Sequence, residues 1–422
     1  MLERAIEPKT YPMPTFEPLK AQKQILKNGI PVFALHNPDM QLVRLDVRIK
    51  AGSFFQQKPA VASAVGKLLT EGTKQFTAEQ IAEKMDYAGT YLDVITERDF
   101  ASLSIYFPAN VTQNILPLLS HILTDSIFPQ EKLEIFINRQ KQRLSVQLEK
   151  TEYLSYRSFT EALFGATHPY GISLKINDLD NLTVKDLQTF HQKYYHAGNM
   201  RIFVAGNIDM NLSEQLESTF GTINRFDGAE FEYYEPNCEG EKILYTPKSN
   251  AVQSSICIGK RLFDRRHPQW NKMLILNAVL GGYFGSRLMT NIREEKGLTY
   301  GIYSRIQSFM TDGYLAICAD VNKKLRKKAL IEIYAELEKL CTTPIDENEL
   351  KLVKNYLYGS LLRGFDGVFS QIDKIQRADD FHLSDNYLDN YLETIAQIQP
   401  ADLLSMAQKY LQKESMYEIA VG

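Results

Sequence analysis

Side chains that could bind a metal or act as nucleophiles are scattered along this 422-residue chain. Its seven histidines form neither an H-x-x-E-H nor an H-E-x-x-H motif, the patterns in which histidine-based zinc sites place two histidines and a glutamate on one helix. Its four cysteines contain no C-x-x-C pair, and we expect them to be free thiols, mostly buried. These residues are His36, His121, His168, His191, His196, His267 and His382, and Cys238, Cys257, Cys318 and Cys341. They predict no metal site of their own.

Two neighbouring segments of the C-terminal half contain further residues with strong hydrogen-bond donors. A glycine-rich run, GGYFGSRL, occupies residues 281–288, and REEKGLTY occupies residues 293–300. The glycine run lacks the G-K-[ST] ending of a phosphate-binding loop. Arg293 and Tyr300 are the donors of interest. By spacing alone, their simpler interpretation is a solvated helix charge and the first residue of a strand.

The elements that position these segments belong to a duplicated chain. Residues 181–206 and 397–422 align without a gap at an offset of 216, which is 422 − 206. Each copy predicts a short helix, a polar turn and an apolar strand. Residues 220–242 are rich in turn formers and carboxylates, which indicates a linker. We therefore expect one domain over residues 1–219 and a second over residues 243–422.

The hydrophobic pattern within each half mixes strands with helices. In the N-terminal half, strands are predicted over 31–36, 42–49 and 92–107, and helices over 58–69, 77–85 and 129–164. In the C-terminal half, strands are predicted near 254–258 and 300–317, and helices over 270–280, 324–340 and 347–363. Strands followed by grouped helices favour an α+β class over a doubly wound parallel sheet.

Length and composition restrict the possible classes of protein. The chain is long enough for two domains of about 200 residues each. Its 48 Lys+Arg and 51 Asp+Glu give a net charge of −3, which offers no electrostatic attraction for nucleic acid or an anionic membrane. No apolar run reaches the length of a membrane span, and the charged N-terminus lacks the apolar region of a secretory signal. We expect a cytoplasmic protein with no nucleic acid or membrane partner.

Several segments in a fixed order resemble the pitrilysin/insulinase-like zinc peptidases, a family that includes the mitochondrial processing peptidases. They are LKNGIPV at 26–32, RIKAGS at 48–53, HPYG at 168–171, the glycine run and REEKGLTY. The resemblance covers nearly the whole chain. It implies two homologous α+β domains, each a mostly antiparallel sheet with helices packed on one face, enclosing a central chamber of peptide size.

The resemblance places the family's inverted zinc motif, H-x-x-E-H, within residues 60–73. The motif positions are Ser63, Gly66 and Lys67, and the position of the third ligand falls at Leu144. Zinc in peptidases is bound by imidazole nitrogen and carboxylate oxygen, and it lowers the pKa of a bound water to about 7. A lysine at a ligand position would repel Zn²⁺. We therefore predict no catalytic residue, metal or cofactor in this chain alone, with zinc held by a partner chain.

The resemblance also indicates how substrate is held. In relatives, an arginine and a tyrosine at the positions of Arg293 and Tyr300 project toward substrate bound at the zinc. The phenol can donate to a substrate carbonyl or a developing oxyanion, and the guanidinium can orient the tyrosine or hold the peptide. Peptide also adds as a strand to a sheet edge, and the matching edge contains Leu92, Asp93 and Val94. These five residues form the predicted substrate-binding site.

The function implied by these patterns is that of a non-catalytic, substrate-binding subunit of a zinc metallopeptidase. We expect a dimer with a chain that carries an intact H-x-x-E-H motif, acting on unstructured peptides. One alternative is a stand-alone metallopeptidase with an unrecognised metal site, which metal analysis would detect. The other is a peptide-binding or scaffold protein without a proteolytic role, which a neighbouring gene for an H-x-x-E-H relative would argue against.

Overall fold

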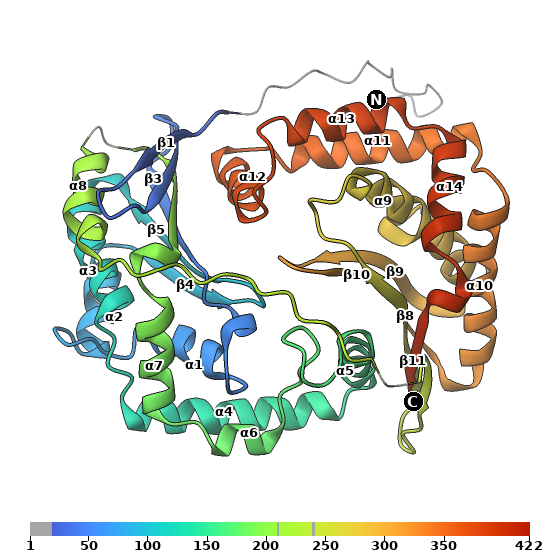
Figure 1. Cartoon of the computed structure of the whole chain (residues 1–422), viewed down its shortest axis with the longest axis horizontal. Coiled ribbons are helices and arrows are strands. Elements are labelled where there is room, and N and C mark those ends of the chain that lie inside the picture. Colours follow the sequence, from blue (N-terminus) through green and yellow to red (C-terminus); the bar gives the residue numbers. More distant parts are fainter. Residues whose placement is uncertain (1–18, 209–210, 239–240) are drawn as a thin grey trace, which may run out of the picture.

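The computed structural model describes residues 19–208, 211–238 and 241–422, which form two halves around a common interior (Figure 1). The first sheet has the strand order β1 (Gln22–Ile25), β2 (Pro31–His36), β6 (Met200–Gly206), β3 (Leu42–Ile49), β5 (Ala101–Pro108) and β4 (Tyr91–Thr96). The second sheet has the order β7 (Ile243–Thr246), β11 (Tyr417–Val421), β8 (Gln253–Leu262), β10 (Gly313–Asn322) and β9 (Thr299–Ser308). Apart from the additional β1, the two orders correspond strand for strand, so β4 and β9 are equivalent edges.

Both sheets are mostly antiparallel and contain one parallel pair each. β2 runs parallel to β6, and β7 runs parallel to β11. Because each sheet combines hairpins with a returning strand from the end of its half, the pairing is mixed and not doubly wound. The predicted α+β class with two similar domains is confirmed.

Helices account for most of the remaining chain. In the first half they are α1 (Val61–Leu68), α2 (Ala78–Tyr87), α3 (Thr112–Thr124), α4 (Gln130–Leu148), α5 (Thr151–Phe164), α6 (Ile176–Asp180), α7 (Val184–Tyr194) and α8 (Leu212–Thr219). In the second half they are α9 (Trp270–Asn277), α10 (Arg326–Thr342), α11 (Glu347–Arg363), α12 (Val368–Asp380), α13 (Tyr387–Gln397) and α14 (Pro400–Tyr410). None of the described helices combines the length and apolarity needed to cross a bilayer.

The internal repeat folds as predicted, into a helix, a short turn and a strand. The helices α7 and α14 begin and end at positions that differ by 216 residues, because 400 − 184 and 410 − 194 both equal 216. Asp186 and Asp402 are both the third residue of their helix, where the carboxylate accepts the backbone N–H of the residue that precedes the helix. This reciprocal cap satisfies two backbone donors and explains why the sequence repeats an aspartate there.

Each sheet is covered on one face by helices of its own half and on the other face partly by a helix of the opposite half. Val43, Leu45 and Val47 of β3 belong to the core under α1 and α3. On the opposite face of that sheet, Phe33 and Phe203 pack against the start of α12. The prediction of helices on one face of each sheet therefore describes only part of the packing. The helix α12 of the second half also covers part of the other face of the first sheet.

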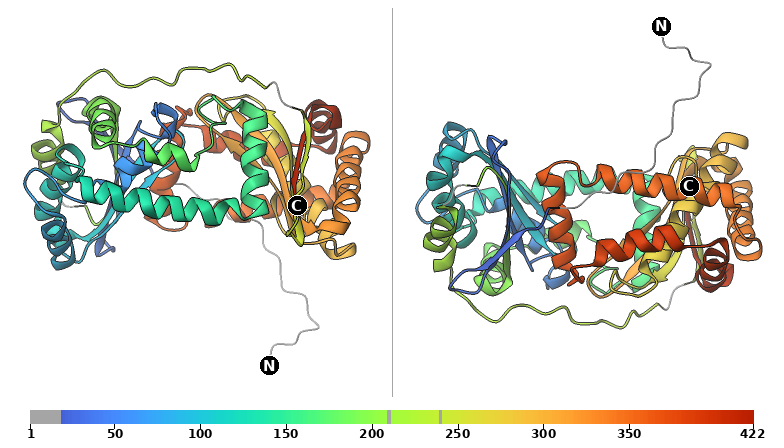
Figure 2. Two further views of the ribbon diagram at one scale, coloured as in Figure 1. Left: turned by 90° about the horizontal axis from the view of Figure 1, so that it is seen from below. Right: turned by 90° about the horizontal axis from the view of Figure 1, so that it is seen from above.

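The helix α5 makes the reciprocal crossing from the first half to the second sheet. The helix lies against β8 and β11, and its Phe159 and Phe164 belong to one apolar cluster with Cys257 and Cys318 of that sheet. The segment 223–238 contains no helix or strand and runs extended along one side of the molecule from one half to the other (Figure 2). It lies within the predicted linker.

Candidate substrate-binding site

The degenerate zinc positions lie on α1, whose residues are mostly buried. The Ser63 hydroxyl donates to the Ala60 carbonyl at 3.0 Å, within its own helix. A Cβ atom at Gly66 would lie 2.5 Å from the Thr96 hydroxyl oxygen, so β4 packs too closely for a larger residue. The Lys67 ammonium donates to the Val94 carbonyl at 3.3 Å. The Ser63 hydroxyl and the Lys67 ammonium are not the imidazole ligands of the motif, and Gly66 has no side chain.

The position of the third ligand is equally unsuited to a metal. Leu144 is an apolar residue of α4 with only 3% of its surface exposed. The nearby Glu149 pairs with the Lys248 ammonium of the second half at 2.8 Å. Among the residues that the structure describes, no group of three or more His, Cys, Asp or Glu is placed to hold a metal ion. The residues at the family's zinc positions therefore do not fit zinc.

The predicted peptide-binding edge is the outer strand of the first sheet. Leu92 and Val94 pack against the core of the first half, so their side chains face the helices and not the open edge. Asp93 alternates with them and lies on the opposite face of the sheet. The Lys67 ammonium already occupies one carbonyl of this strand, at Val94. Any strand added here would be held through backbone groups, with Lys67 as a competing donor.

Arg293 and Tyr300 are brought together at the equivalent edge of the second sheet. Arg293 lies in a wide π-type turn, Met289–Glu295, that follows the glycine run. Its guanidinium carbon is 5.3 Å from the centre of the Tyr300 ring and 4.9 Å from that of Phe284. Tyr300, at the start of β9, is 91% exposed. The arginine thus lies between two aromatic rings and contacts a phenol that projects into solvent.

The glycine run sets the position of this pair. A Cβ at Gly281 would lie 2.7 Å from the Ser304 backbone nitrogen of β9, so only glycine permits this approach. Further along, the Arg287 guanidinium makes two hydrogen bonds of 2.8 Å to Glu349 of α11. The first contact fixes the run on β9 and the second fixes it on a helix. Phe284 was not singled out from the sequence, although its place inside the run was a usable signal.

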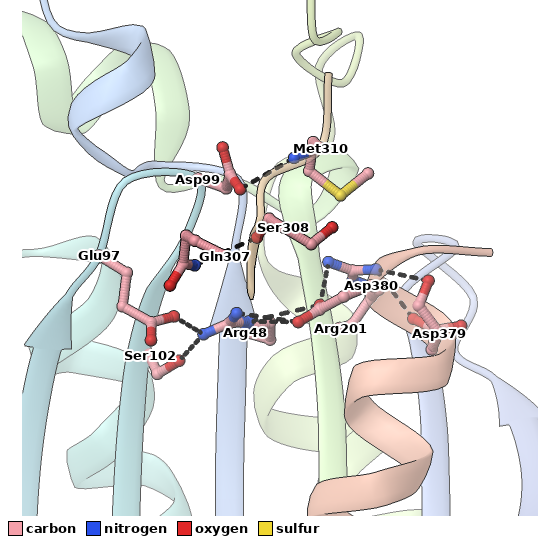
Figure 3. Close-up of polar contacts among 10 residues, drawn as sticks. All are labelled: Arg48, Glu97, Asp99, Ser102, Arg201, Gln307, Ser308, Met310, Asp379 and Asp380. Carbon is pink, nitrogen blue, oxygen red and sulfur yellow. Dashed lines mark hydrogen bonds and ion pairs between the residues drawn. The ribbon is translucent and has the colours of Figure 1, made fainter. Parts of the chain in front are cut away.

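Charged residues that were not predicted join the two halves through α12 (Figure 3). Arg48 of β3 pairs with Asp380 at 2.8 Å, and Arg201 of β6 pairs with Asp380 at 3.0 Å and with Asp379 at 2.9 Å. Both guanidinium groups also lie over the Phe100 ring. Because the partners are more than 170 residues apart, no local pattern reports these contacts.

A second junction between the halves is a buried carboxylate. Asp99 accepts a hydrogen bond from the Met310 backbone N–H at 3.1 Å, as drawn in Figure 3. It also accepts one from the Tyr170 hydroxyl at 2.6 Å. Burial raises the pKa of Asp99 to about 6, although both hydrogen bonds oppose that shift. The HPYG segment therefore has a structural role here, because Tyr170 donates to the carboxylate that joins Asp99 to Met310 of the second half.

A pocket of about 650 Å³ lies between the halves, close to these two junctions. It is lined by Arg48 and Asp99 of the first half and by Gln307 and Ser308 at the end of β9. We call it the interior pocket. Its size is within the range of small-ligand sites, and one wall is the end of β9, the edge strand whose second residue is Tyr300.

The fold and these residues define a two-domain peptidase-like chamber whose zinc positions hold other residue types. Residues 32–168 match the family model described as Insulinase (Peptidase family M16), and residues 181–357 match Peptidase M16 inactive domain. The chain belongs to the M16 peptidase family, as its resemblance implied.

Curated relatives are similar to most of this chain, and a solved structure shares its fold. An uncharacterized zinc protease of Bacillus subtilis is 24% identical over 352 residues, covering 82% of this chain and 85% of that protein. A second, of Rickettsia felis, is 24% identical and covers 91% and 93%. The crystal structure of a peptidase M16 inactive domain from Pseudomonas fluorescens has a TM-score of 0.88 at 21% identity, over 96% of this chain and 98% of that one.

Proposed function

We propose that this chain is a non-catalytic, substrate-binding subunit of a zinc metallopeptidase, paired with a chain that carries an intact H-x-x-E-H motif. The observation that carries the proposal is a contrast between the two halves. In the first, Ser63, Gly66 and Lys67 stand at the zinc positions. In the second, Arg293 and the exposed Tyr300 remain in contact. The substrate-contacting part is kept while the ligands are replaced.

The exposed phenol has the chemistry that such a subunit needs. Tyr300 has an O–H donor, and a donor aimed at a carbonyl stabilises the negative charge that develops there during peptide hydrolysis. The ring lies 5.3 Å from the Arg293 guanidinium carbon and the residue is 91% exposed, so the hydroxyl is accessible to a ligand. The sheet edges at β4 and β9 offer backbone groups to an extended peptide. The partner supplies zinc and the activated water.

The test is peptide cleavage by a reconstituted pair. The chain is mixed with a candidate partner, an M16-family protein that carries an intact H-x-x-E-H motif, and hydrolysis of an unstructured fluorogenic peptide is measured. Tyr300→Phe should leave the complex assembled and slow turnover by about 10²–10³-fold. Arg293→Ala should weaken peptide binding or misplace the tyrosine, and the double variant should be less than additive because the pair acts as a unit.

A matched control is available on the surface of the first half. Tyr87 of α2 is 95% exposed, so Tyr87→Phe removes a comparable hydroxyl that belongs neither to the Arg293–Tyr300 pair nor to the Leu92–Val94 edge. Normal turnover in both Tyr300→Phe and Arg293→Ala, in complexes shown to be assembled, would contradict the proposal and favour a scaffold. Peptidase activity of the chain alone with bound metal would favour a stand-alone enzyme.

A further inference from the structure

A second pocket, of about 540 Å³, lies wholly within the C-terminal half. Four cationic side chains line it, namely Arg265, Arg266, Lys374 and Arg377. None of the described residues that line it is Asp or Glu. We call it the basic pocket. Such an accumulation of one sign of charge in a concave site favours an anionic ligand.

The cations are unbalanced because α12 presents its carboxylates to the opposite side. Asp373 pairs with Arg44 of β3 at 2.7 Å, and Asp380 and Asp379 pair with arginines of the same sheet. Lys374 and Arg377, three residues apart, lie together on a different side of the helix, which lines the pocket. The carboxylates of α12 are thus used in ion pairs with the first half, and Lys374 and Arg377 on another side of the same helix are left without an acidic partner within the described parts of the chain.

Two of the lining cations show the effect of this arrangement. Arg266 is paired with Asp264 at 2.7 Å, but Arg265, Lys374 and Arg377 have no ion pair with any residue that the structure describes. Burial and the nearby Arg377 lower the pKa of Arg265 to about 10. Burial, Arg377 and Arg265 lower the pKa of Lys374. Burial is the larger cause of both shifts and the neighbouring cations add to it, so an anion bound beside these side chains would favour their charged forms.

Apolar side chains cover much of the remaining wall. Trp270 of α9, Phe365 after α11 and Leu388 of α13 all line the basic pocket. The Arg265 guanidinium lies 5.0 Å from the Trp270 ring centre, so charge and apolar surface are adjacent. A ligand that satisfies both needs an oxyanion next to an apolar group. The end of a peptide with an apolar last residue has this chemistry, because its carboxylate and side chain share one carbon.

The basic pocket also adjoins the place where a peptide would lie. Arg265 and Arg377 line the interior pocket as well as the basic pocket. The Arg265 backbone N–H donates to the Ser308 hydroxyl, at the end of β9, at 3.0 Å. A peptide extended along β9 would therefore bring its end to these arginines.

We propose that the basic pocket captures the C-terminal carboxylate of a peptide whose last residue is apolar. This inference deepens the proposed function by naming the class of substrate, and it rests on that function. The guanidinium groups of Arg265 and Arg377 have paired N–H donors that fit a carboxylate. The rings of Trp270 and Phe365 would contact the apolar side chain of the last residue.

The chain contains one tryptophan, Trp270, so its fluorescence reports on this pocket directly. The intact chain is titrated with an unstructured peptide ending in leucine, either as the free acid or as the C-terminal amide. We expect the free acid to bind at least about tenfold more tightly. Arg265→Gln and Arg377→Gln should each reduce this preference. Arg139→Gln, an exposed arginine of α4 without a described ion pair, should keep it.

Three results would overturn the proposal. One is equal affinity of the wild-type chain for acid and amide, and another is an unchanged preference in both folded arginine variants. The third is saturation by inorganic tripolyphosphate while neither peptide binds, which would assign the pocket to a phosphate compound. The titration needs no partner and no turnover. A failure here with normal Tyr300-dependent cleavage would remove only this inference.

Discussion

Replacing Asp99 by asparagine tests whether a buried carboxylate at the junction of the halves makes stability depend on pH. Asp99→Asn removes the charge and keeps an oxygen that can accept from the Met310 N–H or the Tyr170 O–H. The pKa of Asp99 is about 6, against 3.8 for an ordinary aspartate. Because a tenfold change in proton affinity is worth about 1.4 kcal/mol, this difference corresponds to about 3 kcal/mol.

The sign follows from the raised pKa. The folded protein binds the proton more tightly than the unfolded chain, so this stabilising contribution is fully present below pH 3.8 and is lost as the pH rises through about 6. Between pH 5 and 7.5 the wild type should lose about 1.5 kcal/mol from Asp99 alone. The asparagine variant lacks this titration and should not lose that stability. Its free energy of unfolding relative to wild type should therefore rise by the same amount as the pH increases from 5 to 7.5.

The assay is urea unfolding of both proteins at several values between pH 5 and 7.5. Comparing the two proteins cancels the titration of all other groups that the substitution leaves unchanged. Asp86→Asn, at an exposed position of α2, is the matched control and should run parallel to wild type. A constant difference between Asp99→Asn and wild type across this range would refute the reasoning.

Three further outcomes are expected. Asp380→Asn should destabilise the protein by about 3 kcal/mol or more in urea unfolding, because it leaves two buried arginines short of a partner. Restoring the motif by Ser63→His, Gly66→Glu and Lys67→His should give no efficient hydrolysis of a fluorogenic peptide in added zinc, because the position of the third ligand still holds the apolar Leu144 and a Cβ at position 66 would meet the Thr96 hydroxyl oxygen at 2.5 Å. Elemental analysis of the purified wild-type chain should find no stoichiometric zinc.

Each of these has a contradicting result. Asp227→Asn, an exposed linker position, is the control for Asp380→Asn, and equal stability of the two variants would show that α12 is not held by its ion pairs. Efficient cleavage by the restored motif would show that Leu144 is not the position of the third ligand. One tightly held zinc per wild-type chain, lost on mutating residues near Ser63, would contradict the conclusion that α1 binds no metal.

Local elements of the fold were accessible from the sequence, because their signals are short-range. The strands Pro31–His36 and Leu42–Ile49 and the helix Glu347–Arg363 begin and end where the hydrophobic pattern predicted them. The repeat was visible because both copies need the same helix cap and the same apolar strand. The helices α3, α6, α8, α12 and α13 were missed, and α3 carries Pro117 in its interior, which weakens a helical pattern.

What the sequence by itself determined is the family, the α+β class, the residue types at the zinc positions and the Arg293–Tyr300 pair. Only the tertiary structure decided how these are used. It placed Phe284 against Arg293, put the Lys67 ammonium on the edge strand, and sent α12 across to the other half. The physical reason is sequence separation: the ion pairs that hold α12 join residues more than 170 positions apart, and no periodicity within a segment records such contacts.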